Sequence, residues 1–199
     1  HAQRPDATAC AELELWNQKM SRWVNRGAKG IALLDDTGPR TRLRYVFDIA
    51  DTHLVRGGKT PLLWNLDSHE HEQTILDHLA DTYGLSQTDS MNAALMELAQ
   101  QFRIVSIPMD GLAYEVADTF LEELDEDNIR VRFRELMTNS IFYTLSRRCG
   151  QEPMDVLDDD DFIRIVDFNK LPVLSFLGNA VSEQCEAVLF DIVREMRKI

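Results

Sequence analysis

The sequence predicts an α+β protein, with a small strand-rich unit and flanking helices over residues 1–84 and a mostly helical region over residues 85–199. Residues 30–49 hold two short apolar or alternating runs around a turn-rich cluster, which is typical of a β-hairpin. From Ser90 onward, apolar residues recur at helical spacing almost to the end. With 44% hydrophobic and 28% charged residues, the chain has ordinary globular composition and should fold.

The N-terminal unit is expected to begin with a helix over residues 8–24, which Gly27 ends. Apolar residues recur at helical spacing there: Cys10, Leu13, Trp16, Met20, Trp23 and Val24. A strand over residues 30–34, a turn over 35–39 and a second strand over 40–49 follow. The period of two places Arg40, Arg42 and Arg44 on one face of that second strand.

Further along, residues 61–66 are expected to form a third strand after a loop that contains Gly57-Gly58. A short helix capped by Ser68 should end before Gly84. Helices are then expected over residues 90–102, 111–124, 128–149 and 159–169, with two more within 172–199 separated near Gly178-Asn179. For residues 102–108, a strand and an irregular connection both stay open.

Charge is divided unevenly along the chain, whose net charge is −13. Residues 1–84 hold 10 basic and 12 acidic groups (net −2), whereas residues 85–199 hold 11 and 22 (net −11). The segment from Lys19 to Arg44 carries seven basic groups against Asp35 and Asp36, or +5: Lys19, Arg22, Arg26, Lys29, Arg40, Arg42 and Arg44. A polyanion could bind there.

Two motifs that suggest nucleotide or metal chemistry fail on spacing. Gly57-Gly58-Lys59-Thr60 resembles the end of a P-loop, but His53 stands where the first glycine is required and Pro61 where a helix should begin. His69-Glu70-His71-Glu72 would need a histidine in place of Gln73 to match the zinc motif HExxH. A flexible loop and an exposed helix start explain the two stretches.

Acidic runs at residues 122–127 and 158–161 lack the ligand spacing of a calcium loop, so helix capping and a solvated face explain them. No catalytic Ser, His and Asp or Cys and His signature is recognisable, so we expect a non-catalytic module without metal or cofactor.

Cys10, Cys149 and Cys185 form no CxxC pair, which favours a reducing cytoplasm. The apolar runs are too short to span a membrane, and the start at His1 suggests a piece of a longer protein.

Basic and aromatic residues are interleaved in the first third of the chain. Alternating arginines lie near Trp16, Trp23, Tyr45 and Trp64, a combination typical of surfaces that bind single-stranded nucleic acid. Two structural explanations stay open. The tryptophans at 16 and 23 could be the core face of a helix, and the arginines could be the solvated face of a sheet.

The order of residues in the first third follows a family pattern. Trp16, the Arg22-x-Val24 pair, residues 27–33 and residues 45–52 parallel the motifs Trp, Arg-x-Val, Lys-Gly-x-Lys-Gly-Ile and Val-Phe-Asp-x-x-x-Thr. These motifs resemble the N-terminal domain of the ArdC antirestriction family, which is associated with single-stranded DNA and carried by plasmids, phages and conjugative elements. The remainder is similar in arrangement to the region after this domain in large mobile-element proteins with helicase-like or DNA methyltransferase parts. The family's peptidase motif HExxH is absent, so peptidase activity is not expected.

The resemblance implies a non-catalytic module that binds single-stranded DNA weakly, through the seven basic groups of the +5 segment. It also implies structural roles for Trp16, Gly27, Gly30, Phe47, Asp48 and Thr52. The two glycines would form a turn that holds Lys29 at its tip, and Asp48 and Thr52 would fix the strand exit by side-chain hydrogen bonds to the backbone. Other domains of a parent protein are expected partners. The alternatives are a protein-docking or DNA-mimicking role for the acidic helices, or a scaffold.

Overall fold

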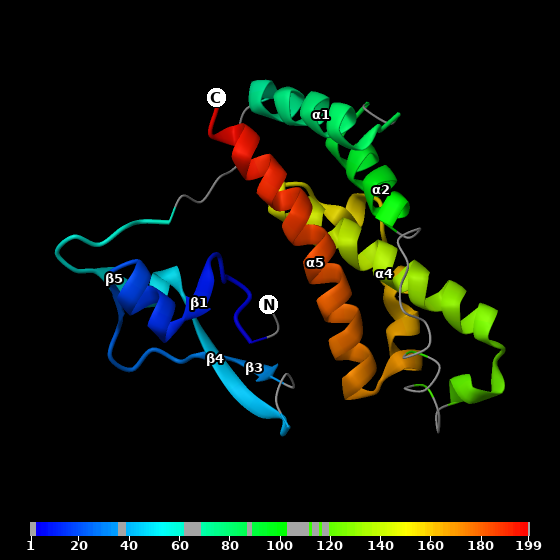
Figure 1. The fold of residues 1–199 in the computed structure, drawn as a ribbon, viewed down its shortest axis with the longest axis horizontal. Coiled ribbons are helices and arrows are strands. Elements are labelled where there is room, and N and C mark those ends of the chain that lie inside the picture. Colours follow the sequence, from blue (N-terminus) through cyan, green and yellow to red (C-terminus); the bar gives the residue numbers. More distant parts are fainter. Residues whose placement is uncertain are drawn as a thin grey trace. The chain divides into compact units, whose positions relative to one another are not determined.

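The computed structural model describes residues 3–35, 39–61, 69–86, 89–102, 112, 116 and 120–198 (Figure 1). The chain divides into two compact units, His1–Leu63 and Trp64–Ile199. The described strands belong to the first unit and the α-helices to the second, so the α+β fold class is confirmed. The expected boundary after residue 84 differs from this division, because helix α1 (His69–Tyr83) packs on helices of the second unit.

The first unit contains two small antiparallel sheets among its described residues. One sheet has the order β1 (Cys10–Glu12), β4 (Arg42–Asp48), β3 (Ile31–Asp35), and the other pairs β2 (Arg22–Val24) with β5 (Thr52–Leu54). In the register of the larger sheet, Val46 lies opposite both Ile31 and Glu12. The expected hairpin is thus confirmed as β3 and β4, and β4 extends well beyond β1 in Figure 1.

The helix expected over residues 8–24 is wrong. The segment forms β1, a five-residue π-helix (Leu15–Lys19) and β2. The indole of Trp16 is buried, and its Nε1 donates to the carbonyl oxygen of Phe47 at 2.8 Å, whereas Trp23 is 57% exposed. Pairing with distant strands has overridden the local helical spacing, which a sequence pattern cannot reveal. The third strand expected over residues 61–66 lies outside the described residues, except for Pro61, which has no regular structure.

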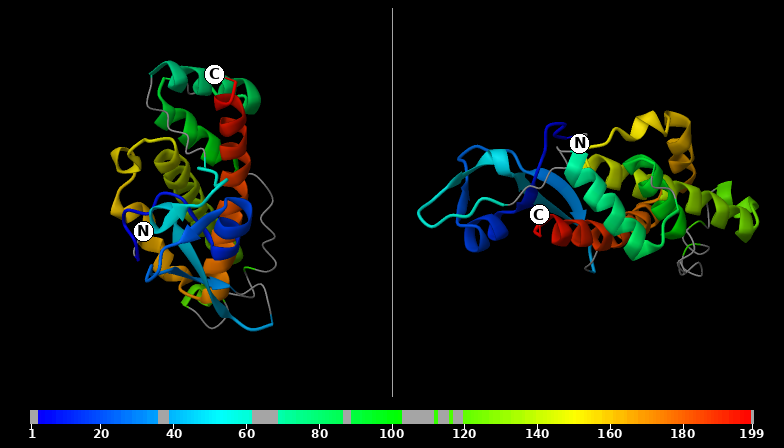
Figure 2. Two further views of the ribbon diagram at one scale, coloured as in Figure 1. Left: turned by 90° about the vertical axis from the view of Figure 1, so that its left-hand side faces the viewer. Right: turned by 90° about the horizontal axis from the view of Figure 1, so that it is seen from above.

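The second unit is built around α4 (Glu126–Arg148). It packs against α2 (Met91–Phe102) and α5 (Leu171–Met196), and α1 packs against α2 and α5 (Figure 2). Short 3-10 helices lie at Phe120–Glu123, Pro153–Asp155 and Asp159–Phe168. The ring of Phe133 is fully buried, with the rings of Phe168 and Phe176 at centroid distances of 5.4 and 5.7 Å. This apolar core accounts for the stability of the helical unit.

Most of the helix predictions for this unit are confirmed. The expected helices over residues 90–102 and 128–149 correspond to α2 and α4, and the one over 159–169 is a 3-10 helix. Asp158 caps that last helix and forms a capping box with Asp161, as the capping interpretation predicted. The expectations for residues 102–108 and 111–124 fall mostly outside the described residues.

The break expected near Gly178-Asn179 is wrong, because α5 continues through both residues. Its buried stripe, from Val173 and Leu177 on to Val181, faces the core without interruption. Packing of this stripe compensates for the low helix propensity of one glycine, about 1 kcal/mol. Among the helices that the structure describes, none combines the length and the apolar composition that crossing a bilayer requires.

Candidate nucleic-acid interface

The pair of strands β2 and β5 presents an aromatic side chain to solvent. Trp23 lies directly opposite His53 in the register, so their side chains share one face of this two-stranded sheet. Trp23 is 57% exposed, and the Nδ1 atom of His53 lies 2.7 Å from the side-chain oxygen of Asn25. The exposed indole is therefore available for stacking with a flat ring.

A glycine turn folds the chain after β5 back along the residues that precede β2. The backbone N–H of Val55 donates to the carbonyl of Ser21 at 3.2 Å, and that of Lys59 donates to the carbonyl of Met20 at 2.8 Å. Gly57 has φ +81°, and a Cβ on Gly58 would lie 2.5 Å from the oxygen of Ser21. The turn requires both glycines for conformation and space, which explains this sequence without a P-loop.

The two segments joined in this way, residues 19–30 and 52–60, contain no acidic residue. They hold four and two basic residues respectively, and none of these six takes part in an ion pair within the part of the chain that the structure describes: Lys19, Arg22, Arg26, Lys29, Arg56 and Lys59. All except Arg22 are exposed. We call these six residues, together with Trp23 and His53, the basic ribbon.

Arg22 does not present its guanidinium to solvent as the sequence analysis expected. It is only 8% exposed; its Nε donates to the hydroxyl of Thr52 at 2.7 Å and its Nη2 to the carbonyl of Thr52 at 3.4 Å. These bonds hold β2 to β5, so a direct phosphate contact by Arg22 is not supported. No carboxylate of the described residues lies within ion-pair distance of Arg22, so this buried member of the ribbon keeps an uncompensated positive charge.

The arginines near and in β4 have a different environment. The Nε of Arg42 lies 2.8 Å from a carboxylate oxygen of the buried Asp35, and the Nε of Arg44 lies 3.0 Å from a carboxylate oxygen of Glu12. Arg40 precedes the strand, is exposed, and forms no ion pair with another described residue. The predicted arginine face is thus neutralised at two of its three positions, and it does not include the indole of Trp23.

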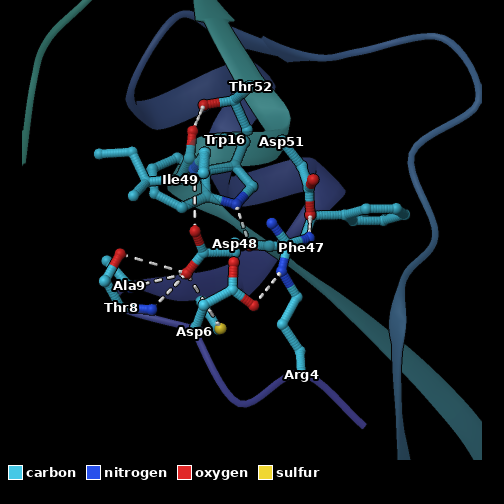
Figure 3. Close-up of polar contacts among 12 residues, drawn as sticks. Arg4, Asp6, Thr8, Ala9, Trp16, Phe47, Asp48, Ile49, Asp51 and Thr52 are labelled. Atoms are coloured by element: carbon cyan, nitrogen blue, oxygen red, sulfur yellow. Dashed lines mark hydrogen bonds and ion pairs between the residues drawn. The ribbon is translucent and has the colours of Figure 1, made fainter.

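Asp48, the last residue of β4, accepts hydrogen bonds from several backbone N–H groups (Figure 3). One carboxylate oxygen accepts from the backbone N–H groups of Thr8 at 2.6 Å and Ala9 at 3.0 Å, and the other accepts from that of Ala50 at 2.9 Å. Burial alone would raise the pKa of Asp48, but these hydrogen bonds outweigh it and lower the pKa. The hydroxyl of Thr52 donates to the carbonyl of Ile49 at 2.8 Å, so the expected fixing of the strand exit is confirmed.

The remaining motif residues also act within the first unit. Gly27 adopts φ +87° in the turn after β2, which the N–H of Ala28 closes by donating to the carbonyl of Asn25 at 3.1 Å, and the exposed Lys29 follows this turn. A Cβ on Gly30 would lie 3.1 Å from the Cβ of Tyr45 and 3.2 Å from the ring of Phe47, so the strand pair accepts only glycine without adjustment. Arg4 and Asp51 form an ion pair close to the hydrogen bonds that Asp48 accepts (Figure 3). The expected turn at Gly27 is present, but Lys29 follows it rather than lying at its tip, and Gly30 is required by close packing rather than by the turn.

Three residues of the ribbon are not predicted by the sequence pattern: His53, Arg56 and Lys59. They lie in or next to the expected loop around Gly57-Gly58, and nothing local indicates that residues 52–54 pair with β2. A usable signal was present, because residues 52–60 lack acids in a chain with 34 of them. Within the described residues, no group of three or more His, Cys, Asp or Glu side chains is placed to hold a metal ion.

The chain matches no known protein family, no curated protein and no solved structure. The resemblance to the ArdC N-terminal domain therefore stays a prediction.

Proposed function

We propose that the first unit is a non-catalytic module that binds single-stranded DNA weakly and without sequence preference through the basic ribbon. The observation that carries the proposal is the pairing of two acid-free basic segments around the exposed indole of Trp23. Such a combination of cations and a stacking ring is typical of single-strand binding. The ArdC-like residue order agrees with the same function.

The aromatic ring and the cations of the ribbon have different roles in this proposal. An unstacked base lies against the ring of Trp23, while four of the five exposed cations contact phosphates: Lys19, Arg26, Arg56 and Lys59. Arg22 adds attraction at short range, since a polyanion would supply the counter-charge that it lacks. A duplex keeps its bases stacked inside, so the indole favours single strands.

A fluorescence-anisotropy titration of the full chain with labelled oligothymidylate tests the proposal. For four phosphate contacts, the logarithm of the binding constant should fall with that of the salt concentration with a slope of about −3, since each contact to a single strand contributes about −0.7. Trp23→Ala should weaken binding about 5- to 150-fold, because stacking is worth about 1–3 kcal/mol per base. No binding at about 50 mM salt would refute the proposal.

Two charge-reversal variants of the full chain distinguish the basic ribbon from the β4 arginines. The ribbon variant changes Lys19, Arg26, Arg56 and Lys59 to Glu, and the matched control changes Arg40, Arg42 and Arg44 to Glu. Binding should be lost in the first and reduced less than threefold in the second. The opposite result would assign DNA to the β4 face instead. Circular dichroism spectra should show that both variants fold.

We infer further that the module works in the cytoplasm, attached to other domains of a mobile-element protein.

For the acidic helical unit, docking of a protein partner is better supported than DNA mimicry. Ion pairs neutralise several carboxylates there, among them Arg130 with Glu126 at 2.7 Å. Phe190, in contrast, is 67% exposed beside a groove formed by α4 and α5. Removal of the apolar surface by Phe190→Ser should abolish such docking in a pull-down of the parent protein's other domains.

A further inference from the structure

Strand β4 has an open edge over half its length. On one side, β3 covers residues 42–46 of β4. On the other side, β1 covers only residues 46–48. Among the described residues, the edge of β4 from Arg42 to Tyr45 thus has no partner strand on the side of β1.

The register shows which backbone groups face this edge. The N–H of Ile49 donates to the carbonyl of Ala9 at 2.8 Å, so odd-numbered residues of β4 direct their N–H and C=O toward β1. By alternation, Leu43 and Tyr45 direct theirs to the uncovered part of the same side. No backbone hydrogen bond to these groups is present within the described residues. They form a short template for another strand.

A groove lies at this edge, between the chain after β1 and the strand itself. Its lining residues are Glu12, Leu13, Glu14, Asn17, Gln18, Arg44 and Tyr45, and we call it the edge groove. Leu13 is 48% exposed and Tyr45 is 50% exposed, so its walls offer apolar surface. The side-chain oxygen of Asn17 is buried without a hydrogen-bond partner in the described part of the chain. A donor from a bound molecule would satisfy it.

The charge of the edge groove favours a ligand with a positively charged side chain. Glu12 is paired with Arg44 at 3.0 Å. Glu14 forms no ion pair with the described residues, and its carboxylate accepts only a hydrogen bond from the amide of Gln18 at 2.9 Å. The groove therefore carries one uncompensated negative charge, which disfavours the polyanion proposed for the basic ribbon and favours Lys or Arg.

We propose that the edge groove binds an extended peptide of a partner protein, which adds a strand to β4. Backbone hydrogen bonds to Leu43 and Tyr45 would provide affinity. Apolar side chains at alternate positions would pack on Leu13 and Tyr45, and a Lys or Arg between them would face Glu14. This site is separate from the basic ribbon and does not depend on DNA binding.

Selection from a displayed library of random ten-residue peptides against the full chain tests this proposal. The enriched peptides should alternate apolar residues and contain Lys or Arg. A synthetic copy of the best one should slow hydrogen exchange at the amides of Leu43 and Tyr45 at least tenfold. The amides of Arg42 and Arg44, which face β3, should change less than twofold.

Surface substitutions and modified peptides separate a loss of peptide binding from a loss of folding. Glu14→Lys, a surface change, should weaken the selected peptide at least tenfold, and Lys59→Glu should leave it unchanged. N-methylation of the peptide amides that face β4 should abolish binding, whereas N-methylation of the alternate amides should not. Failure to enrich any peptide, or enrichment of peptides that bind Glu14→Lys equally well, would overturn the proposal. So would a dimer in sedimentation that Glu14→Lys dissociates, since the occupant would then be a second copy.

Discussion

The substitution Asp48→Asn should destabilise the first unit while leaving the helical unit intact. In the native chain, two carboxylate oxygens serve three backbone N–H groups, those of Thr8, Ala9 and Ala50. An asparagine has one oxygen acceptor, and its NH₂ group would meet N–H donors in either orientation. At least one backbone N–H therefore loses its acceptor next to the side chain at position 48, which is fully buried.

The magnitude follows from these contacts. One unsatisfied buried N–H costs about 1–3 kcal/mol, and the loss of charge on the remaining hydrogen bonds costs about 1 kcal/mol more. We expect the free energy of unfolding of the first unit to fall by about 3 kcal/mol at neutral pH. That loss is large for a unit whose buried hydrophobic side chains, among the described residues, are those of Trp16 and Val46.

The effect should depend on pH. Because the folded-state pKa of Asp48 is lowered, the stabilisation is present above the unfolded-state pKa of about 4 and is lost as the pH falls through the lower folded-state pKa. The native protein and Asp48→Asn should therefore differ most near pH 7. Their stabilities should converge once the pH falls below the lowered folded-state pKa of Asp48.

Hydrogen exchange monitored by mass spectrometry measures this effect in each unit separately. Peptides from the first unit should lose protection in Asp48→Asn, and peptides from α4 and α5 should not. Glu12→Gln is the matched control, since this carboxylate is 45% exposed in a surface ion pair and should contribute less than about 1 kcal/mol. The reasoning would be refuted if Asp48→Asn reduced the stability of the first unit no more than Glu12→Gln does.

Two further predictions concern the helical unit and the thiols. Gly178→Ala should stabilise the helical unit by about 1 kcal/mol in thermal unfolding, because a Cβ there meets nothing within 4 Å inside a continuous helix; destabilisation would contradict that continuity. With Ellman's reagent at pH 8, one thiol of the native chain should react, that of the exposed Cys10. Burial raises the pKa of Cys149 and Cys185 to about 12, so they should react only after denaturation; rapid reaction of all three would contradict their burial.

The helical half of the fold was largely predictable because its signals are local. The apolar spacing of α2 and α4 and the cap at Asp158 depend on residues a few positions apart. The hairpin of β3 and β4 was predictable for the same reason, since its strands are close in sequence. The failed break at Gly178 shows the limit, because the core contacts of α5 outweigh the weak propensity of one residue.

The candidate site was predictable only in part. The basic segment from Lys19 and the structural roles of Asp48 and Thr52 could be inferred from residue order. The neutralisation of Arg42 could not, because it depends on which acid the register places beside it. The exposure of Trp23 depends likewise on β2 being a strand rather than a helix.

The sequence by itself determined the α+β class, the acidic helices and the excess of basic residues between Lys19 and Arg44, because composition and short-range spacing carry that information. Only the tertiary structure decided which of the described basic side chains lie outside ion pairs. It paired β2 with β5, two segments 30 positions apart at Arg22 and Thr52, and so added Arg56 and Lys59 to the basic ribbon. Strand pairing is a long-range interaction, and the charge of a surface depends on neighbours that the linear order does not name.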